Sequence, residues 1–126
     1  MNPTERIELT KAYVALSNAH RLDLVLPMFA AEAAYRSTYV GEFAGKPAIG
    51  RLMAEFFTRF PDVYWEVEAY RGRGANAVEF AFVMTATEAA TGQAVRRQAV
   101  ETLEFTDAGF IVRVAVTDSP TAPPVA

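Results

Sequence analysis

Alternation dominates the second half of the chain. Between Val63 and Asp118, apolar residues recur at every second position in four runs, and the turn segments "RGRGAN", "ATG" and "TDAG" separate these runs. Strict alternation of this kind is typical of β-strands that bury one face. The sequence therefore predicts four consecutive strands, and their apolar, largely aromatic face requires a covering layer.

Helical spacing in the first half supplies that layer. Apolar residues three and four positions apart predict two short helices before residue 30 and a longer amphipathic helix between Pro47 and Phe60. A further strand, ending at Gly41, separates the second and third helices. The first helix is expected to begin at Asn2–Glu5, which resembles a capping box with a proline in the first turn. Its expected apolar face is Leu9, Ala12, Tyr13 and Leu16.

These elements predict a single α+β domain with the order α-α-β-α-β-β-β-β, in which a curved antiparallel sheet wraps around the helices as a cone. The domain is expected to span residues 1–118, and the proline-rich segment 119–126 is expected to be a disordered tail. Such a cone leaves a hollow that suits a small-molecule site, although aromatic rows are also common in plain cores. The residues expected to bind substrate there are Tyr35, Ser37, Tyr39, Phe56, Phe60, Trp65, Phe80, Phe82 and Asp118.

The composition excludes several functional classes. The chain has 126 residues and a formal net charge of −3, so no nucleic-acid partner is expected. It has no cysteine and one histidine, which excludes disulfides and argues against a zinc site, so no metal or organic cofactor is expected. The N-terminal segment lacks the apolar stretch of a signal peptide, and no segment is apolar enough to span a membrane. A cytoplasmic protein without a membrane partner is therefore expected.

Glu101 is the most informative single residue. It shares the parity of Ala99, Leu103 and Phe105 in the segment "QAVETLEF", so its carboxyl group is expected to point to the apolar face of that strand. A lone carboxylate on such a face is costly. Glu101 is therefore expected at a rim, in a site, or beside a core hydroxyl or an arginine.

Beyond these patterns, the element order and several segments resemble the nuclear transport factor two-like superfamily, which has a cystatin-like cone fold. The segments that carry the resemblance are "AYVALSNAHRLDLVLPMFAAEAAYRS", "GKPAIGRLMAEFF", "NAVEFAF" and "ETLEFTDAGFIVRV". They are most similar to the ketosteroid-isomerase-like and polyketide-cyclase-like (SnoaL-like) branches. The superfamily includes isomerases, cyclases, epoxide hydrolases, dehydratases and binding domains without activity, so the resemblance implies the fold more strongly than the function.

The resemblance also implies roles for three residues. In ketosteroid isomerases, a tyrosine on the first helix and a protonated acid on a late strand bind the substrate oxygen, and an aspartate on the first strand is the base. By resemblance, Tyr13 and Glu101 occupy the two donor positions as catalytic residues, and Ser37 or an immediate neighbour occupies the position of the base. Tyr13 and Glu101 could share a proton and present two donors to a ligand oxygen. Serine is no general base unless it is activated, so the sequence departs from the steroid-isomerase pattern at the position of the base.

Two classes of function remain open. The first is a small-molecule-binding protein of the SnoaL-like type that acts as an isomerase, cyclase or lyase, by acid–base catalysis on an apolar, carbonyl-bearing substrate. The second is a non-catalytic ligand-binding or dimerisation domain of the same fold, which the missing carboxylate at Ser37 favours. An epoxide hydrolase ranks last, because its Asp-Arg-Asp cluster has no counterpart among the positions expected to face inward.

Two polar residues and one surface complete the expectations. His20 lies in the connection "NAHRLD" near the surface, and a catalytic role would require it to face the pocket. Asp118 could stand at the cone mouth with Arg97, where a rim salt bridge is the simpler interpretation. A homodimer is expected because apolar residues interrupt the charges on the outer face of the sheet. These residues are Tyr64, Tyr70, Ala81, Val83 and Val100.

Overall fold

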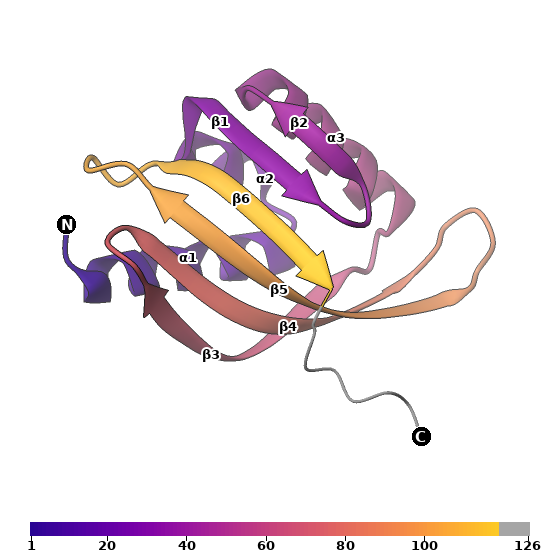
Figure 1. Cartoon of the computed structure of the whole chain (residues 1–126). Coiled ribbons are helices and arrows are strands. Elements are labelled where there is room, and N and C mark those ends of the chain that lie inside the picture. The colour runs from indigo at the N-terminus through magenta and orange to yellow at the C-terminus, as the bar shows by residue number, and fades with distance from the viewer. Residues whose placement is uncertain (119–126) are drawn as a thin grey trace.

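Helices come first along the chain, and strands dominate after residue 60 (Figure 1). The structure is a computed structural model that describes residues 1–118, and the tail expected at 119–126 lies outside the described residues. The order of elements confirms the expected α+β class. The elements are α1 (Pro3–Asn18), α2 (Leu22–Val25), the 3-10 turn η1 (Leu26–Met28), β1 (Phe29–Ser37), β2 (Gly41–Ala44), α3 (Lys46–Arg59), β3 (Tyr64–Arg73), β4 (Ala77–Thr87), β5 (Ala94–Phe105) and β6 (Ile111–Asp118).

The sheet has six strands in the order β2-β1-β6-β5-β4-β3. The segment expected to be one strand ending at Gly41 is the hairpin β1–β2, and Gly41 has a φ of +102°, a region that favours glycine. Strand β1 pairs with β6 in parallel, so the sheet is mixed and not wholly antiparallel as expected. This pairing brings together the first and last strands of the chain, which no local sequence pattern specifies.

The three helices lie on one side of the curved sheet (Figure 1). Helix α1 packs on β3 and β4, whereas α3 packs on β1 and β2, so the two long helices cover different halves of the sheet. The second helix is shorter than expected, because Pro27 lacks an N–H and the chain passes through η1 into β1 at Phe29. No helix among residues 1–118 is long and apolar enough to cross a membrane.

Helix α1 begins as expected but buries a different face. The Asn2 side chain accepts a hydrogen bond from the Glu5 amide at 2.8 Å, and the Glu5 side chain accepts one from the Asn2 amide at 3.0 Å. The buried face contains Thr10 and Ser17 beside Tyr13, whereas Leu9 and Leu16 are half-buried. The Thr10 and Ser17 hydroxyls donate to backbone carbonyls four residues earlier, at 2.8 and 2.7 Å, so their polarity is satisfied within the helix.

Strand β3 contains an irregularity that changes the direction of Tyr70. Its register against β4 shifts between Val67 and Tyr70, and Tyr70 then pairs opposite Phe80. The two rings pack at a centroid distance of 5.2 Å on the inner face. The expectation that Tyr70 lies on the outer face is therefore wrong, because a β-bulge inserts one extra residue and reverses the alternation.

Candidate functional site

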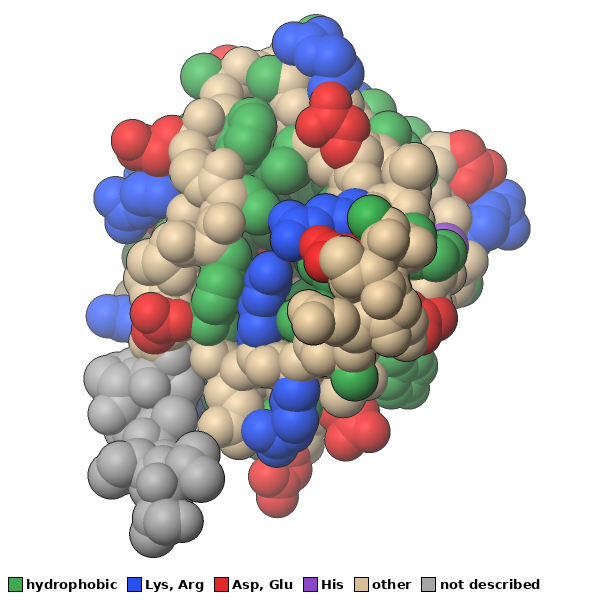
Figure 2. All heavy atoms as spheres, turned by 90° about the vertical axis from the view of Figure 1, so that its right-hand side faces the viewer, with side chains coloured by type: hydrophobic (Ala, Val, Ile, Leu, Met, Phe, Trp, Pro, Cys, Tyr) green, Lys and Arg blue, Asp and Glu red, His purple; other side chains and the backbone are tan. Residues whose placement is uncertain are grey.

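The concave face of the sheet and the helices α1 and α3 enclose a cavity of about 80 Å³. This volume exceeds the ~10–15 Å³ that one water molecule requires, so the cavity has room for a small ligand group. Figure 2 shows the side of the molecule on which hydrophobic side chains are visible in a hollow, crossed by Lys or Arg and Asp or Glu side chains. The lining residues are Tyr13, Val14, Ser17, Tyr35, Ser37, Tyr39, Val40, Leu52, Met53, Phe56, Phe57, Trp65, Phe80, Phe82, Met84, Arg97, Glu101 and Val116.

Most of the candidate residues from the sequence line this cavity. Those that do are Tyr13, Tyr35, Ser37, Tyr39, Phe56, Trp65, Phe80, Phe82 and Glu101. Sequence reasoning missed further residues of α3, although Leu52, Met53 and Phe57 share the helical face of Phe56. These side chains stay half-buried because they face the cavity. Arg97 was also missed as a lining residue, although it shares the strand parity of Glu101.

Phe60 and Asp118 do not line the cavity. Phe60 is fully buried, and its ring packs against that of Phe56 at 5.0 Å, so it supports the cavity wall from the core. Asp118 is exposed beside Tyr39, and contact with its carboxylate raises the pKa of the Tyr39 hydroxyl, which donates a hydrogen bond to the Gln98 carbonyl oxygen at 3.3 Å. Within residues 1–118, Asp118 forms no salt bridge with Arg97, because its side chain faces Tyr39.

His20 is outside the cavity and has a structural position. It has a φ of +57° at the turn between α1 and α2, and its Nε2 lies 2.8 Å from the Val63 carbonyl oxygen. Its ring stacks on Phe57 at 4.7 Å, behind the cavity wall. His20 therefore connects the helix junction to the start of β3 and does not reach the lining.

Glu101 lies at the inner end of the cavity with an unsatisfied carboxyl group. Its side chain is 6% exposed between Ala99 and Leu103, both of which are fully buried, as the alternation of β5 predicted. The Oε2 atom has no hydrogen-bond partner among residues 1–118. Burial raises the pKa of Glu101 to about 8, and interaction with the Tyr13 hydroxyl opposes this rise. At neutral pH the carboxyl group is therefore mostly protonated.

Three tyrosines surround this acid. Burial raises the pKa of Tyr13, Tyr35 and Tyr70, and the nearby Glu101 carboxylate raises all three further. Each phenol therefore stays protonated at neutral pH and remains a hydrogen-bond donor. Tyr13 and Tyr35 line the cavity together with Glu101, so this part of the lining has neutral hydrogen-bond donors, whereas Tyr70 lies outside the lining.

Ser37 lies across the sheet from the acid. Val116 of β6 pairs with Ser37 on the parallel strand β1 and with Glu101 on the antiparallel strand β5. Two strand spacings therefore separate the Ser37 and Glu101 Cα atoms, which corresponds to about 10 Å. The Ser37 hydroxyl accepts a hydrogen bond from the Tyr39 amide at 3.1 Å, which stabilises the turn into β2. The Ser37 side chain thus lines the cavity, but its hydroxyl oxygen already accepts a hydrogen bond from a backbone amide.

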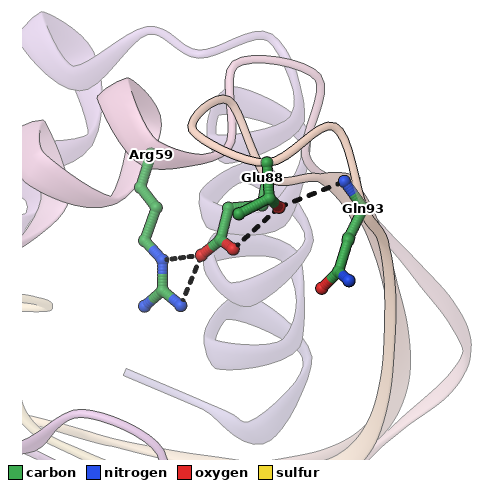
Figure 3. Close-up of polar contacts among 4 residues, drawn as sticks. Arg59, Glu88 and Gln93 are labelled. Atoms are coloured by element: carbon green, nitrogen blue, oxygen red, sulfur yellow. Dashed lines mark hydrogen bonds and ion pairs between the residues drawn. The ribbon is translucent and has the colours of Figure 1, made fainter.

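The long hairpin between β4 and β5 is fixed to the end of α3 beside the mouth. The Arg59 guanidinium contacts the Glu88 carboxylate through Nε at 2.8 Å and through Nη2 at 2.7 Å (Figure 3). The amide of Ala89 also donates to the Arg59 carbonyl at 2.9 Å. These contacts hold the hairpin against the helix that forms the cavity wall.

Residues 10–114 match the sequence profile of the SnoaL-like domain. The chain belongs to this family. The resemblance to the nuclear transport factor two-like superfamily is thereby confirmed. No curated protein is significantly similar to the chain in sequence. Among residues 1–118, no cluster of three His, Asp or Glu side chains could hold a metal ion.

Solved structures agree with the SnoaL-like fold. AclR, a candidate hydroxylase from Streptomyces galilaeus, is 25% identical over 91% of this chain and 89% of its own, with a TM-score of 0.78. SalBIII, an epoxide hydrolase/cyclase-like enzyme in pyran ring formation in salinomycin, is 20% identical over 94% and 93% of the two chains, with a TM-score of 0.82. A candidate isomerase from Bacillus subtilis is 20% identical over 95% and 91%, with a TM-score of 0.80. The last two similarities establish the fold alone.

Proposed function

We propose that this SnoaL-like domain binds a small apolar molecule through one carbonyl or hydroxyl oxygen, which accepts hydrogen bonds from Glu101 and Tyr13. The observation that carries the proposal is the buried Oε2 atom of Glu101, which has no partner among residues 1–118 and belongs to a cavity-lining side chain. A buried polar group without a partner destabilises a protein, and native proteins rarely retain one without a use. A ligand oxygen would supply the missing partner.

Acid–base catalysis on a carbonyl compound follows from the same two residues. A carboxylic acid with a pKa of about 8 is close to the pH at which proton transfer in both directions is efficient. As negative charge develops on a substrate carbonyl oxygen, Glu101 would donate its proton and Tyr13 a hydrogen bond. This chemistry suits an isomerase, cyclase or lyase, and the chemistries named for AclR, SalBIII and the Bacillus subtilis protein support a catalytic use of the fold.

A non-catalytic ligand-binding domain is the second candidate, and Ser37 favours it. Enolisation of a carbonyl compound requires a base near the carbon that loses a proton, and the position expected to supply it holds a serine whose hydroxyl accepts from Tyr39. Among the described residues that line the cavity, Glu101 is the sole carboxylate and there is no histidine. A domain with this lining would recognise an oxygen without removing a carbon-bound proton.

Binding of 2-naphthol and 2-methylnaphthalene tests the proposed oxygen recognition. The two probes have similar size, but only 2-naphthol can hydrogen bond, so we expect it to bind about five- to tenfold more tightly to the wild-type protein. Glu101→Ala should remove this preference. Glu104→Gln, which changes an acid on the outer face of the same strand, should retain it. Equal binding of both probes to the wild type, or an unchanged preference in Glu101→Ala, would contradict the proposal.

Deuterium exchange separates catalysis from binding. 2-Tetralone has an apolar fused ring and acidic protons beside its carbonyl group, and NMR follows their replacement in heavy water. A catalytic domain should accelerate the exchange well above the buffer rate, and Glu101→Ala should reduce the acceleration. Exchange at the buffer rate, with 2-tetralone shown to be bound, would favour the non-catalytic domain.

A further inference from the structure

Arg97 places a positive charge inside the mouth of the cavity. It lies on β5 in the parity of Ala99 and Glu101, so its side chain points to the concave face, and it lines the cavity. It is half-buried, whereas its neighbour Arg96 faces the opposite side and is exposed. The cavity therefore has a cation at one end and the neutral donors around Glu101 at the other.

Aromatic rings orient the Arg97 guanidinium. Its central carbon lies 4.7 Å from the centre of the Tyr39 ring and 5.6 Å from that of Phe60. Cation–π contacts with the flat faces of a guanidinium leave the N–H groups at its edge free to donate. These rings thus fix the position of Arg97 without using its hydrogen-bonding capacity.

No acid within the described part of the chain is paired with Arg97. The carboxylate that acts on the pKa of Arg97 is Glu88, and Arg59 already holds Glu88 through two nitrogens. Asp118, the other acid at the mouth, interacts with the Tyr39 hydroxyl. Burial and the positive charge of Arg59 together lower the pKa of Arg97. Glu88 is thus paired with Arg59 and Asp118 contacts Tyr39, which leaves Arg97 without a carboxylate partner of its own within residues 1–118.

We propose that the ligand is an amphipathic acid whose carboxylate binds Arg97 at the mouth while its carbonyl or hydroxyl oxygen reaches Glu101. This inference rests on the proposed oxygen recognition and adds the substrate class. A planar guanidinium edge binds a carboxylate through two parallel hydrogen bonds. The four-residue separation of Arg97 and Glu101 along one strand corresponds to about 13 Å between their Cα atoms. A ligand that reaches both groups must therefore have its oxygen and its carboxylate at opposite ends, and a rigid naphthalene frame provides this arrangement for a probe.

The matched probes 6-hydroxy-2-naphthoate and 2-naphthol test this assignment. They share the ring system and the hydroxyl group, but only the first has a carboxylate at the far end. We expect the wild-type protein to bind 6-hydroxy-2-naphthoate at least tenfold more tightly than 2-naphthol at pH 7. Arg97→Gln should abolish this advantage while the affinity for 2-naphthol stays within about twofold, which also shows that the cavity is intact. Arg96→Gln, with the same change in net charge, should retain the advantage.

Three results would overturn the assignment. The wild type could bind both probes equally, the advantage of the carboxylate could survive Arg97→Gln, or Arg96→Gln could reduce it as much as Arg97→Gln does. If 2-naphthol binds in a Glu101-dependent way and the carboxylate adds nothing, only the assignment of Arg97 fails. If neither probe binds the wild type, the proposed oxygen recognition fails as well.

Discussion

Replacement of Glu101 by glutamine should change how the stability of the protein depends on pH. The pKa of Glu101 rises from an ordinary 4.5 to about 8 on folding, because burial disfavours the charged form. The folded state therefore binds the proton more tightly than the unfolded state does. The stabilisation due to proton binding is fully present below pH 4.5 and is lost as the pH rises towards 8.

The magnitude of this effect is large relative to the stability of a small domain. Between pH 4.5 and 8 the wild-type protein should lose about 1.4 kcal/mol per pH unit from this group, or about 5 kcal/mol in all. Typical domains have about 5–15 kcal/mol of total stability. Glutamine cannot ionise, so Glu101→Gln should lack this slope. The absolute stability of the variant depends on how the amide is accommodated, and the slope is therefore the diagnostic quantity.

Urea unfolding at pH 5, 6, 7 and 8 measures the slope for both proteins. The unfolding free energy of the wild type minus that of Glu101→Gln should fall by several kcal/mol from pH 5 to pH 8, because only the wild type loses the stabilisation due to proton binding. Glu104→Gln controls for the loss of one negative charge from β5. Parallel curves for wild type and Glu101→Gln would show that Glu101 titrates like a solvated carboxylate, and the burial argument would be refuted.

Three further predictions concern the cavity and the outer face. Tyr13→Phe should raise the pKa of Glu101 further in a carboxyl-carbon NMR titration, because the hydroxyl stabilises the carboxylate; an unchanged value would mean that the two groups do not interact. Phe82→Asp should lower stability by several kcal/mol, since Phe82 is 7% exposed, and an unchanged melting temperature would contradict its inward position. The expected homodimer should give a dimer mass in light scattering at micromolar concentration, and Val83→Lys should weaken it; a monomer mass throughout would count against dimerisation.

Strands β4 and β5 were predictable because apolar and polar residues alternate along them, and this pattern depends only on neighbouring residues. The alternation of β4 and β5 specified their buried faces correctly, and it placed Glu101 inward because Ala99 and Leu103 on either side are apolar. Tyr70 was misplaced because a β-bulge depends on how β3 pairs with β4, which the sequence of β3 alone does not encode.

Helix α1 and the pairing of β1 with β6 show the same limit. Polar residues such as Thr10 and Ser17 are buried in α1 because their hydroxyls bond to their own helix, so a search for apolar residues passes over them. The parallel pairing of β1 with β6 joins distant segments and has no local signature. Arg97 could have been found as a lining residue from its parity, but the absence of an acidic partner depends on Glu88 being held by Arg59.

Ser37 and Glu101 lie on different strands, and this separation determines where a general base could be introduced into the cavity. Glu101, the proposed donor acid, belongs to β5, and Ser37, at the position where the family resemblance implies a base, belongs to β1, with Val116 of β6 between them. Aspartate can accept a hydrogen bond from a backbone amide two residues later, as Ser37 does from Tyr39, so the turn into β2 would tolerate a carboxylate there. The single substitution Ser37→Asp would therefore place a carboxylate about 10 Å from Glu101 on the same concave face, and the cavity would then contain both an acid and a base.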